Sequence, residues 1–264
     1  MAKLQNKTIW ITGASSGIGE ALAYELSGNG NRLILSSRNA SDLEKVKQRC
    51  SYPQHCTVFP LDLSEIDSLP QKATEAVSRF GDVDILVNNA GISQRSLIVD
   101  TEIEVYKRLM EVNYLGTVAL TKALLHHFVQ RGQGHFVTVT SLMGKFGSPL
   151  RSGYCGAKHA LHGFFDVLRM EHEKDGIDVT LICPGFVRTG IAKNALTGDG
   201  SPQGTEDAAT AKGLPVKECA RNIVRAISAK KFEVNLGGKE VLGAYLKRFF
   251  PKILHRVVLS SEVT

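Results

Sequence analysis

The sequence predicts a doubly wound α/β fold, in which helices cover both faces of a parallel sheet of about seven strands. Short apolar runs alternate along the chain with longer stretches whose apolar residues recur every three or four positions. Several of the short runs are apolar throughout, as in strands that are buried on both faces. The 264 residues are 43% hydrophobic and contain no Pro- or Ser-rich linker, so we expect a single domain over residues 1–264.

The expected elements follow one another regularly along the chain. Strands are predicted at 7–12, 32–36, 56–60, 84–88, 135–140, 178–183 and 233–236. Helices are predicted between them at 17–27, 42–50, 69–80, 101–130, 153–174 and 216–230. This alternation favours one parallel sheet and places the core within residues 5–236.

Two segments break the alternation. Residues 190–215 are rich in Gly, Ser, Thr and Ala and are expected to form a long, mobile connection between a strand and a helix. Residues 237–264 form a basic, apolar tail in which apolar positions recur at helical spacing. Pro251 lies inside that pattern and is expected to kink the helix or to start a second one.

Composition excludes several classes of protein. A net charge of +6, spread along the chain, gives no reason to expect nucleic acid as a partner. The five cysteines are an odd number without a CxxC pair, which favours a reducing, cytoplasmic environment over a disulfide framework. We expect no targeting leader, and no apolar run reaches the roughly 18 residues that a membrane-spanning helix needs.

A glycine-rich turn follows the first predicted strand. Residues 12–19 read TGASSGIG, with Gly13, Gly17 and Gly19 immediately before a helical pattern. A tight strand-to-helix turn exposes free N–H groups and the positive end of the helix dipole, and both suit a pyrophosphate. The turn alone leaves the alternative of a glycine-rich loop without a ligand, but its place after the first strand favours a Rossmann-type dinucleotide site.

The end of the second strand points to one form of the cofactor. Residues 36–39 read Ser-Ser-Arg-Asn, without the carboxylate that would bind a free ribose 2′-hydroxyl. The Arg38 guanidinium suits a 2′-phosphate, so NADP(H) is predicted. The alternative is that Arg38 is an ordinary solvated arginine.

Tyr154 and Lys158 form a second candidate site. They lie four residues apart in a predicted helix, so their side chains project within about 40° of each other. A neighbouring ammonium lowers a tyrosine pKa, and such a tyrosine can exchange a proton with an alcohol oxygen. Ser141 lies at the end of the fifth strand, where parallel sheets place their chemistry, and could bind the same oxygen.

Taken together, these motifs resemble the short-chain dehydrogenase/reductase family, in its compact single-domain branch. The resemblance covers about residues 7–236. It rests on TGASSGIG at 12–19, LDLS at 61–64, NNAG at 88–91, Asn113, Ser141, Tyr154-x-x-x-Lys158 and PGFVRT at 184–189.

The resemblance implies a role for each matching residue. Tyr154 would be the general acid or base, Lys158 would hold the nicotinamide ribose, Ser141 would orient the carbonyl, and Asn113 would position a water. The implied cofactor-binding residues are Gly13, Ser15, Ser16, Gly17, Ile18, Gly19, Arg38, Asp62, Leu63, Asn89, Ala90, Gly91, Tyr154, Lys158, Pro184, Gly185, Val187 and Thr189. Residues 190–215 would form a substrate lid, or else a merely flexible connection.

The tail bears on the substrate. Residues 242–259 combine aliphatic and aromatic positions with four Lys and Arg residues and resemble the tails of hydroxysteroid-dehydrogenase-like members, which handle lipophilic substrates. The chemistry expected is therefore interconversion of a lipophilic ketone and its secondary alcohol. The tail could contact a membrane surface, cover the substrate cleft, or pack on a second subunit.

Other expectations are less specific. The eight histidines show no ligand set at familiar spacing, so no metal site is predicted. The resemblance favours a homodimer or homotetramer formed through the helices at 101–130 and 153–174. Alternative functions are a 3-oxoacyl thioester reductase and a catalytically silent NADP-binding regulator or membrane-surface scaffold.

Overall fold

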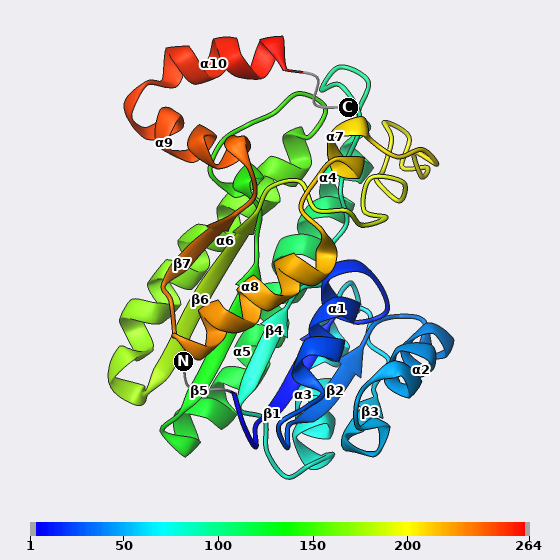
Figure 1. Ribbon diagram of the computed structural model, residues 1–264, viewed down its shortest axis with the longest axis vertical. Helices are drawn as coiled ribbons and strands as arrows, with labels where there is room; N and C mark the ends of the chain where they lie inside the picture. Colours follow the sequence, from blue (N-terminus) through cyan, green and yellow to red (C-terminus); the bar gives the residue numbers. More distant parts are fainter. Residues whose placement is uncertain (1–3, 262–264) are drawn as a thin grey trace.

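Seven parallel strands form one sheet in the order β3-β2-β1-β4-β5-β6-β7 (Figure 1). A computed structural model describes residues 4–261, so positions 1–3 and the last three residues of the predicted tail, 262–264, lie outside the described residues. The strands are β1 (Thr8–Thr12), β2 (Arg32–Ser36), β3 (Cys56–Val58), β4 (Ile85–Asn88), β5 (Gly134–Val139), β6 (Ile177–Pro184) and β7 (Glu233–Leu236). The fold class and the strand count are as predicted, and the bounds differ by a few residues at most.

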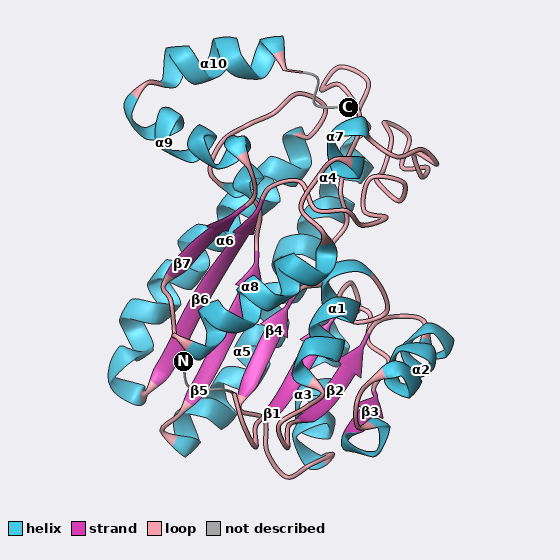
Figure 2. Ribbon diagram, viewed as in Figure 1, coloured by secondary structure: helices cyan, strands magenta, loops and turns pink. Residues whose placement is uncertain are grey.

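Helices cover both faces of the sheet (Figure 2). They are α1 (Gly17–Leu26), α2 (Ala40–Arg49), α3 (Leu69–Ser78), α4 (Ile103–Met110), α5 (Gly116–Arg131), α6 (Ser152–His172), α7 (Ala208–Ala211), α8 (Val216–Ser228), α9 (Leu242–Phe249) and α10 (Pro251–Ser260). Side chains of β1 show the two layers: Ile9 and Ile11 pack with α1, α2 and α8, while Trp10 packs with α3, α5 and α6. Alternate residues of a strand face opposite sides, so an apolar run supplies both cores.

The helix predicted over 101–130 is interrupted. A π-helical turn at Glu111–Leu115 separates α4 from α5. Gly116 follows it, and a Cβ there would lie 2.2 Å from the Leu63 carbonyl oxygen, so only glycine allows this approach. Apolar spacing cannot reveal one extra residue within a turn, and π turns of this kind are common at functional sites.

The connection at 190–215 contains regular structure that its composition does not predict. It includes α7, and isolated bridges join Leu196 to Gln94 and Leu214 to Val187, which lies three residues before the segment. Asp207 anchors it further through a buried ion pair with Arg95, whose Nη2 lies 2.5 Å from the carboxylate. These contacts tie the segment to the rest of the fold, and its mobility stays a prediction.

The tail forms two helices at one end of the molecule, beyond the carboxyl end of β7 (Figure 1). Pro251 begins α10, where its missing N–H costs nothing, and the chain turns sharply at Phe250. Leu254 is buried against Leu142, Phe146 and Cys183. Among residues 4–261, no helix combines the length and the apolar character needed to cross a membrane.

Candidate active site

The carboxyl ends of the strands open into one cleft of about 1070 Å³. It contains every residue singled out above for cofactor or catalysis except Gly19 and Asn113: Gly13, Ser15, Ser16, Gly17, Ile18, Arg38, Asp62, Leu63, Asn89, Ala90, Gly91, Ser141, Tyr154, Lys158, Pro184, Gly185, Val187 and Thr189 line its walls. Gly19 and Asn113 lie directly behind the walls and support them. The structure thus brings motifs from six strand ends to one place.

The glycine turn, residues 13–19, forms one end of the cleft. Gly13 and Gly17 have φ of +64° and +57°, a region that favours glycine. A Cβ on Gly19 would lie 2.2 Å from the Gly13 carbonyl oxygen, so the first turn of α1 packs directly on the strand end. The side chain of Ser16 makes no capping hydrogen bond, and the first N–H groups of α1 face a cleft that Ser15, Ser16 and Gly17 line. This arrangement fits a pyrophosphate.

Asn89 fixes the turn relative to the end of β4. Its amide donates to the carbonyls of Thr12 and Gly13 at 2.9 and 3.2 Å, and its N–H donates to the Thr12 hydroxyl. Thr189 closes the other side, where a Cβ on Gly17 would meet it at 3.3 Å. The walls therefore leave a narrow, preformed channel that suits a dinucleotide.

Positive charge gathers at the end of β2. Arg38 is exposed and lines the cleft with Ser37 and Asn39. Burial favours the neutral form of Asp62 nearby, but hydrogen bonds from Ser64 and the charges of Arg108 and Arg38 prevail and lower its pKa. The carboxylate expected for a free ribose is absent from the end of β2, as the sequence indicates.

Ser141 and Tyr154 meet in the middle of the cleft. The Ser141 hydroxyl donates to the Pro184 carbonyl at 3.3 Å and accepts from the Met143 N–H at 3.0 Å. Burial raises the pKa of Tyr154, while a hydrogen bond with Ser141 and the charges of Arg95 and Arg151 act in the opposite direction. On balance the pKa of Tyr154 is raised by burial, whereas the sequence predicted that the Lys158 ammonium would lower it.

Lys158 is instead held by the main chain. Its Nζ donates to the Val139 carbonyl at 2.9 Å and lies 5.8 Å from the centre of the Tyr154 ring. Burial lowers the pKa of Lys158 to about 8. Asn113, placed by the π turn, bonds to both the N–H and the carbonyl of Ile92 at 2.8 and 2.9 Å. A Cβ on Gly91 would meet Asn113 and the Lys158 Nζ, so the three residues are close neighbours.

Two arginines in this cleft were not indicated by any sequence pattern. Arg95 and Arg151 both contact Asp207, and all three side chains are at most 6% exposed. Burial raises the pKa of Asp207, but hydrogen bonds from Arg95 and Gln203 and the two positive charges outweigh it and keep that pKa low. The network joins the loop after β4, the start of α6 and the 190–215 segment.

The remaining wall is mostly apolar and comes largely from the tail, with Lys239 and Glu240 at the start of that segment. We call this part of the cleft the tail half: Met143, Phe146, Phe186, Ile191, Leu242, Leu246, Leu254, Val257 and Val258 line it. Gly243 allows α9 to approach, since a Cβ there would lie 2.7 Å from the Phe146 ring. The helical spacing of the tail indicated an apolar face but not what that face covers.

Comparison with known proteins agrees with this geometry. A family model described as short chain dehydrogenase matches residues 7–199. Dehydrogenase/reductase SDR family member 7B of Bos taurus is 42% identical over 268 residues, which cover 98% of this chain and 82% of that protein. Dehydrogenase/reductase SDR family member 7 of Homo sapiens is 43% identical over 257 residues, which cover 94% and 76%.

Solved structures show the same relationship. A short-chain dehydrogenase from Streptomyces avermitilis has a TM-score of 0.81 at 27% identity and covers 96% of this chain and 98% of its own. An alcohol dehydrogenase from Thermococcus sibiricus, complexed with 5-hydroxy-NADP, has a TM-score of 0.74 at 28% identity and covers 88% and 97%. The chain therefore belongs to the short-chain dehydrogenase/reductase family of nicotinamide-dependent oxidoreductases, which interconvert carbonyls and alcohols.

Proposed function

We propose that this protein is an NADP(H)-dependent oxidoreductase that interconverts a lipophilic ketone and its secondary alcohol, with Tyr154 as the proton donor or acceptor. The observation that carries the proposal is the shared cleft, in which Tyr154 and Ser141 lie between the glycine turn and the apolar tail half. A bound nicotinamide supplies the hydride in reduction and accepts it in oxidation.

The chain's own residues handle the proton. In reduction, Ser141 donates a hydrogen bond to the carbonyl oxygen, and Tyr154 passes its phenolic proton to that oxygen. Ser141, Arg95 and Arg151 each lower the pKa of Tyr154, so they favour the phenolate that remains. In oxidation the same phenolate takes the proton of the alcohol.

Lys158 and Asn113 would relay a proton from solvent back to the Tyr154 phenolate. A pKa of about 8 lets Lys158 gain and lose a proton near neutral pH. The Asn113 amide, fixed by Ile92, would hold a water that links Lys158 with solvent. Lys158 also lies where it would bind the ribose hydroxyls of the cofactor.

Cofactor preference follows from the charges at the end of β2. Arg38 would pair with the ribose 2′-phosphate, and Asp62 and Leu63 would contact the adenine. Val187 and Thr189, beyond the end of β6, would anchor the carboxamide, with Pro184 and Gly185 beside it. Asn89, Ala90 and Gly91 would line the rest of the channel.

The substrate enters the tail half of the cleft. Aliphatic and aromatic side chains form that wall, which favours an apolar substrate over a charged one. Residues 190–215 act as the lid, because Ile191, Asn194, Leu196, Pro202 and Thr210 all line the cleft.

A spectrophotometric screen tests the reaction. Ketones, aldehydes, acyl thioesters and sterols are offered with NADPH and with NADH, and oxidation of the nicotinamide is followed. Tyr154→Phe should lower kcat by at least about 100-fold because general acid catalysis is lost. Tyr24→Phe is the matched control, since the Tyr24 hydroxyl bonds to Glu20 on α1, away from the cleft.

Each outcome of the screen has one meaning. Undiminished turnover in Tyr154→Phe contradicts the proposed role of the tyrosine. Activity restricted to acyl thioesters would establish the 3-oxoacyl thioester reductase instead. Cofactor binding without turnover on any carbonyl would favour a silent NADP-binding regulator.

The cofactor assignment has its own test. Arg38→Asp should weaken NADP(H) binding at least about tenfold relative to NAD(H), because a paired guanidinium–phosphate contact becomes a repulsion. Arg221→Asp on α8, which is exposed and outside the cleft, controls for the change in net charge. An unchanged preference would show that Arg38 is an ordinary surface residue.

We also propose that the tail contacts an anionic membrane surface. Seven large apolar side chains of residues 242–259 are exposed, among them Phe249 at 68% and Leu259 at 65%. Lys247, Arg248, Lys252 and Arg256 lie among them, and residues 242–259 contain no acidic residue. Apolar groups beside uncompensated cations complement a bilayer with anionic headgroups.

Vesicle co-sedimentation tests this contact. The full chain should bind vesicles that contain phosphatidylserine, and Phe249→Ser with Phe250→Ser should release it. Phe232→Ser is the matched control, because Phe232 is 69% exposed and lies outside the tail. Loss of binding in both variants, or in neither, contradicts the proposal, and dimerisation that depends on Phe249 would assign the face to a second copy.

A homodimer or homotetramer formed through α5 and α6 is the last part of the proposal. Val167 and Met170 on α6 are 46% and 70% exposed and are available for such a contact. The mass of the protein in solution tests it.

A further inference from the structure

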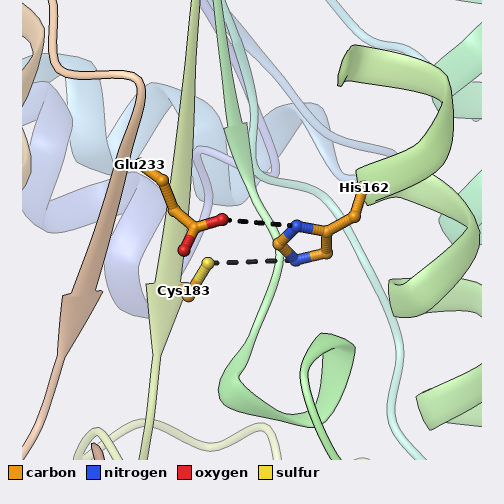
Figure 3. A group of neighbouring side chains, drawn as sticks. All are labelled: His162, Cys183 and Glu233. Atoms are coloured by element: carbon orange, nitrogen blue, oxygen red, sulfur yellow. Dashed lines mark hydrogen bonds and ion pairs between the residues drawn. The ribbon is translucent and has the colours of Figure 1, made fainter. Parts of the chain in front are cut away.

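Three side chains with different donor atoms meet behind the catalytic cleft. His162 comes from α6, Cys183 from β6 and Glu233 from β7, and Figure 3 shows the imidazole facing both the carboxylate and the sulfur, with a dashed line to each. One ligand atom from each lies within 4.8 Å of the others. The distance from the Cys183 Sγ to the His162 Nε2 is 3.9 Å, and the distance from the Glu233 Oε2 to the His162 Nδ1 is 3.7 Å.

The backbone dictates this meeting. Strand register pairs Leu181 with Glu233, so Cys183, two residues further along β6, faces the same side of the sheet. His162 lies one helical turn after Lys158 on α6, the helix that packs on that side. The three residues are thus 21 and 50 positions apart in the sequence, which is why no ligand spacing was visible.

We propose that His162, Cys183 and Glu233 form a binding site for a divalent metal ion of the Zn²⁺ type. A thiolate, an imidazole and a carboxylate are together the donors that such an ion prefers, with water as a fourth ligand. Zinc–ligand bonds of about 2.0–2.3 Å in a tetrahedron place neighbouring donors about 3.5 Å apart. The separation of the Cys183 Sγ and the His162 Nε2, 3.9 Å, is close to this value, whereas the Glu233 carboxylate must shift further to complete the set.

The cluster is not satisfied by its own hydrogen bonds. The His162 Nδ1 is buried without a hydrogen-bond partner, and the imidazole is 12% exposed. Burial lowers the pKa of His162 to about 4, so the ring is neutral at pH 7 and already in the ligand form. Burial raises the pKa of the Cys183 thiol to about 12, so the ion must displace that proton.

A metal ion takes only one nitrogen of the ring. With Nε2 and the Cys183 sulfur as the first two ligands, the Glu233 carboxylate must move round the ring edge to reach the ion. Glu233 is 34% exposed and has a flexible side chain, so this movement is open to it. Lys145, whose ammonium pairs with Glu233, would then turn toward solvent.

The site adjoins the catalytic residues without containing them. Thr140, whose hydroxyl lies 3.2 Å from the Cys183 sulfur, directly precedes Ser141. Cys183 directly precedes Pro184 in the wall of the cleft. An ion bound there would bridge β6, β7 and α6. Its ligand His162 lies one helical turn from Lys158, and Thr140, which contacts the ligand Cys183, is the residue before Ser141.

Cobalt titration of the reduced, chelator-treated full chain tests the site. Co²⁺ should bind in a 1:1 ratio with a near-ultraviolet thiolate-to-cobalt charge-transfer band, and Zn²⁺ should abolish the band by competition. Cys183→Ser should remove the band. Cys219→Ser is the matched control, because both sulfurs are in fully buried residues and Cys219 lies on α8.

Two surface variants keep the test decisive if Cys183→Ser does not fold. Glu233→Gln should weaken Co²⁺ binding at least about tenfold by removing a ligand. Lys145→Met should strengthen it, roughly tenfold, because a competing ammonium is gone. No band in the wild type, a band that persists without Cys183, or an affinity unchanged in both surface variants would overturn the proposal.

Discussion

Main-chain contacts shape the cleft at the glycine turn, whereas side chains shape it in the tail half. At Gly19 a single added methyl group would overlap the carbonyl oxygen of Gly13. Under α9 and α10 the wall consists of aliphatic and aromatic side chains, for which other apolar residues of similar volume could substitute. A close contact between main-chain atoms therefore allows one residue type at a position. A position in the apolar wall requires only a side chain of suitable size and polarity.

The largest effect is expected where the backbone contact is closest. Gly19→Ala should weaken cofactor binding at least about a thousandfold, equal to about 4 kcal/mol at 1.4 kcal/mol per factor of ten, because the new Cβ displaces the turn. Fluorescence titration with NADPH measures it. Gly28→Ala, where nothing lies within 4 Å of the added carbon, should bind normally. Normal binding in Gly19→Ala would show that the turn adapts as freely as the tail half does.

A smaller effect is expected at the ion pairs that anchor the 190–215 segment. Asp207→Asn leaves two buried guanidinium groups without their shared carboxylate and should lower the free energy of unfolding by about 3 kcal/mol. That is at the lower end for a buried pair, since Arg151 keeps contacts to Ser148 and Pro149. Urea denaturation and proteolysis within 190–215 measure it. Asp199→Asn, an exposed carboxylate in the same segment, should change both much less.

The smallest effect is expected at the boundary of the two regions. The pKa of Lys158 falls from 10.5 to about 8 on folding, so the unfolded chain binds the proton more tightly. The ammonium therefore destabilises the fold fully below pH 8, and this penalty is relieved as pH rises toward 10.5. Between pH 8 and pH 9.5 the wild type should gain about 2 kcal/mol relative to Lys158→Met. Urea denaturation of both proteins without cofactor measures the gain, and parallel pH curves would contradict it.

The comparison also explains what the sequence could reveal. Gly13, Gly17 and Gly19 are demanded by backbone geometry, so the turn was visible as a pattern. Tyr154 and Lys158 share one helix and hence one spacing. Arg95, Arg151 and Asp207 meet only through tertiary structure, with Asp207 more than 50 residues from either arginine. No local pattern connects them.

The fold itself was predictable for a related reason. Strands buried on both faces need continuous apolar runs, and helices that cover them need apolar stripes, so both leave periodic traces. Two features leave no periodic trace in the sequence. The π turn at Glu111–Leu115 depends on the close approach of Gly116 to Leu63, and the contacts within 190–215 depend on the ion pair of Asp207.

The π turn before α5 has a consequence for anyone redesigning this helix. One extra residue rotates α4 by about 100° relative to a continuous helix. Val105 and Leu109 on α4 thereby reach Tyr154, while Leu120 and Leu124 on α5 face the central sheet. Deleting one residue would make the helix regular, but the contact of α4 with Tyr154 and the contact of α5 with the central sheet could then not both be kept. The irregularity sets the register in which α4 packs on Tyr154 while α5 packs on the central sheet.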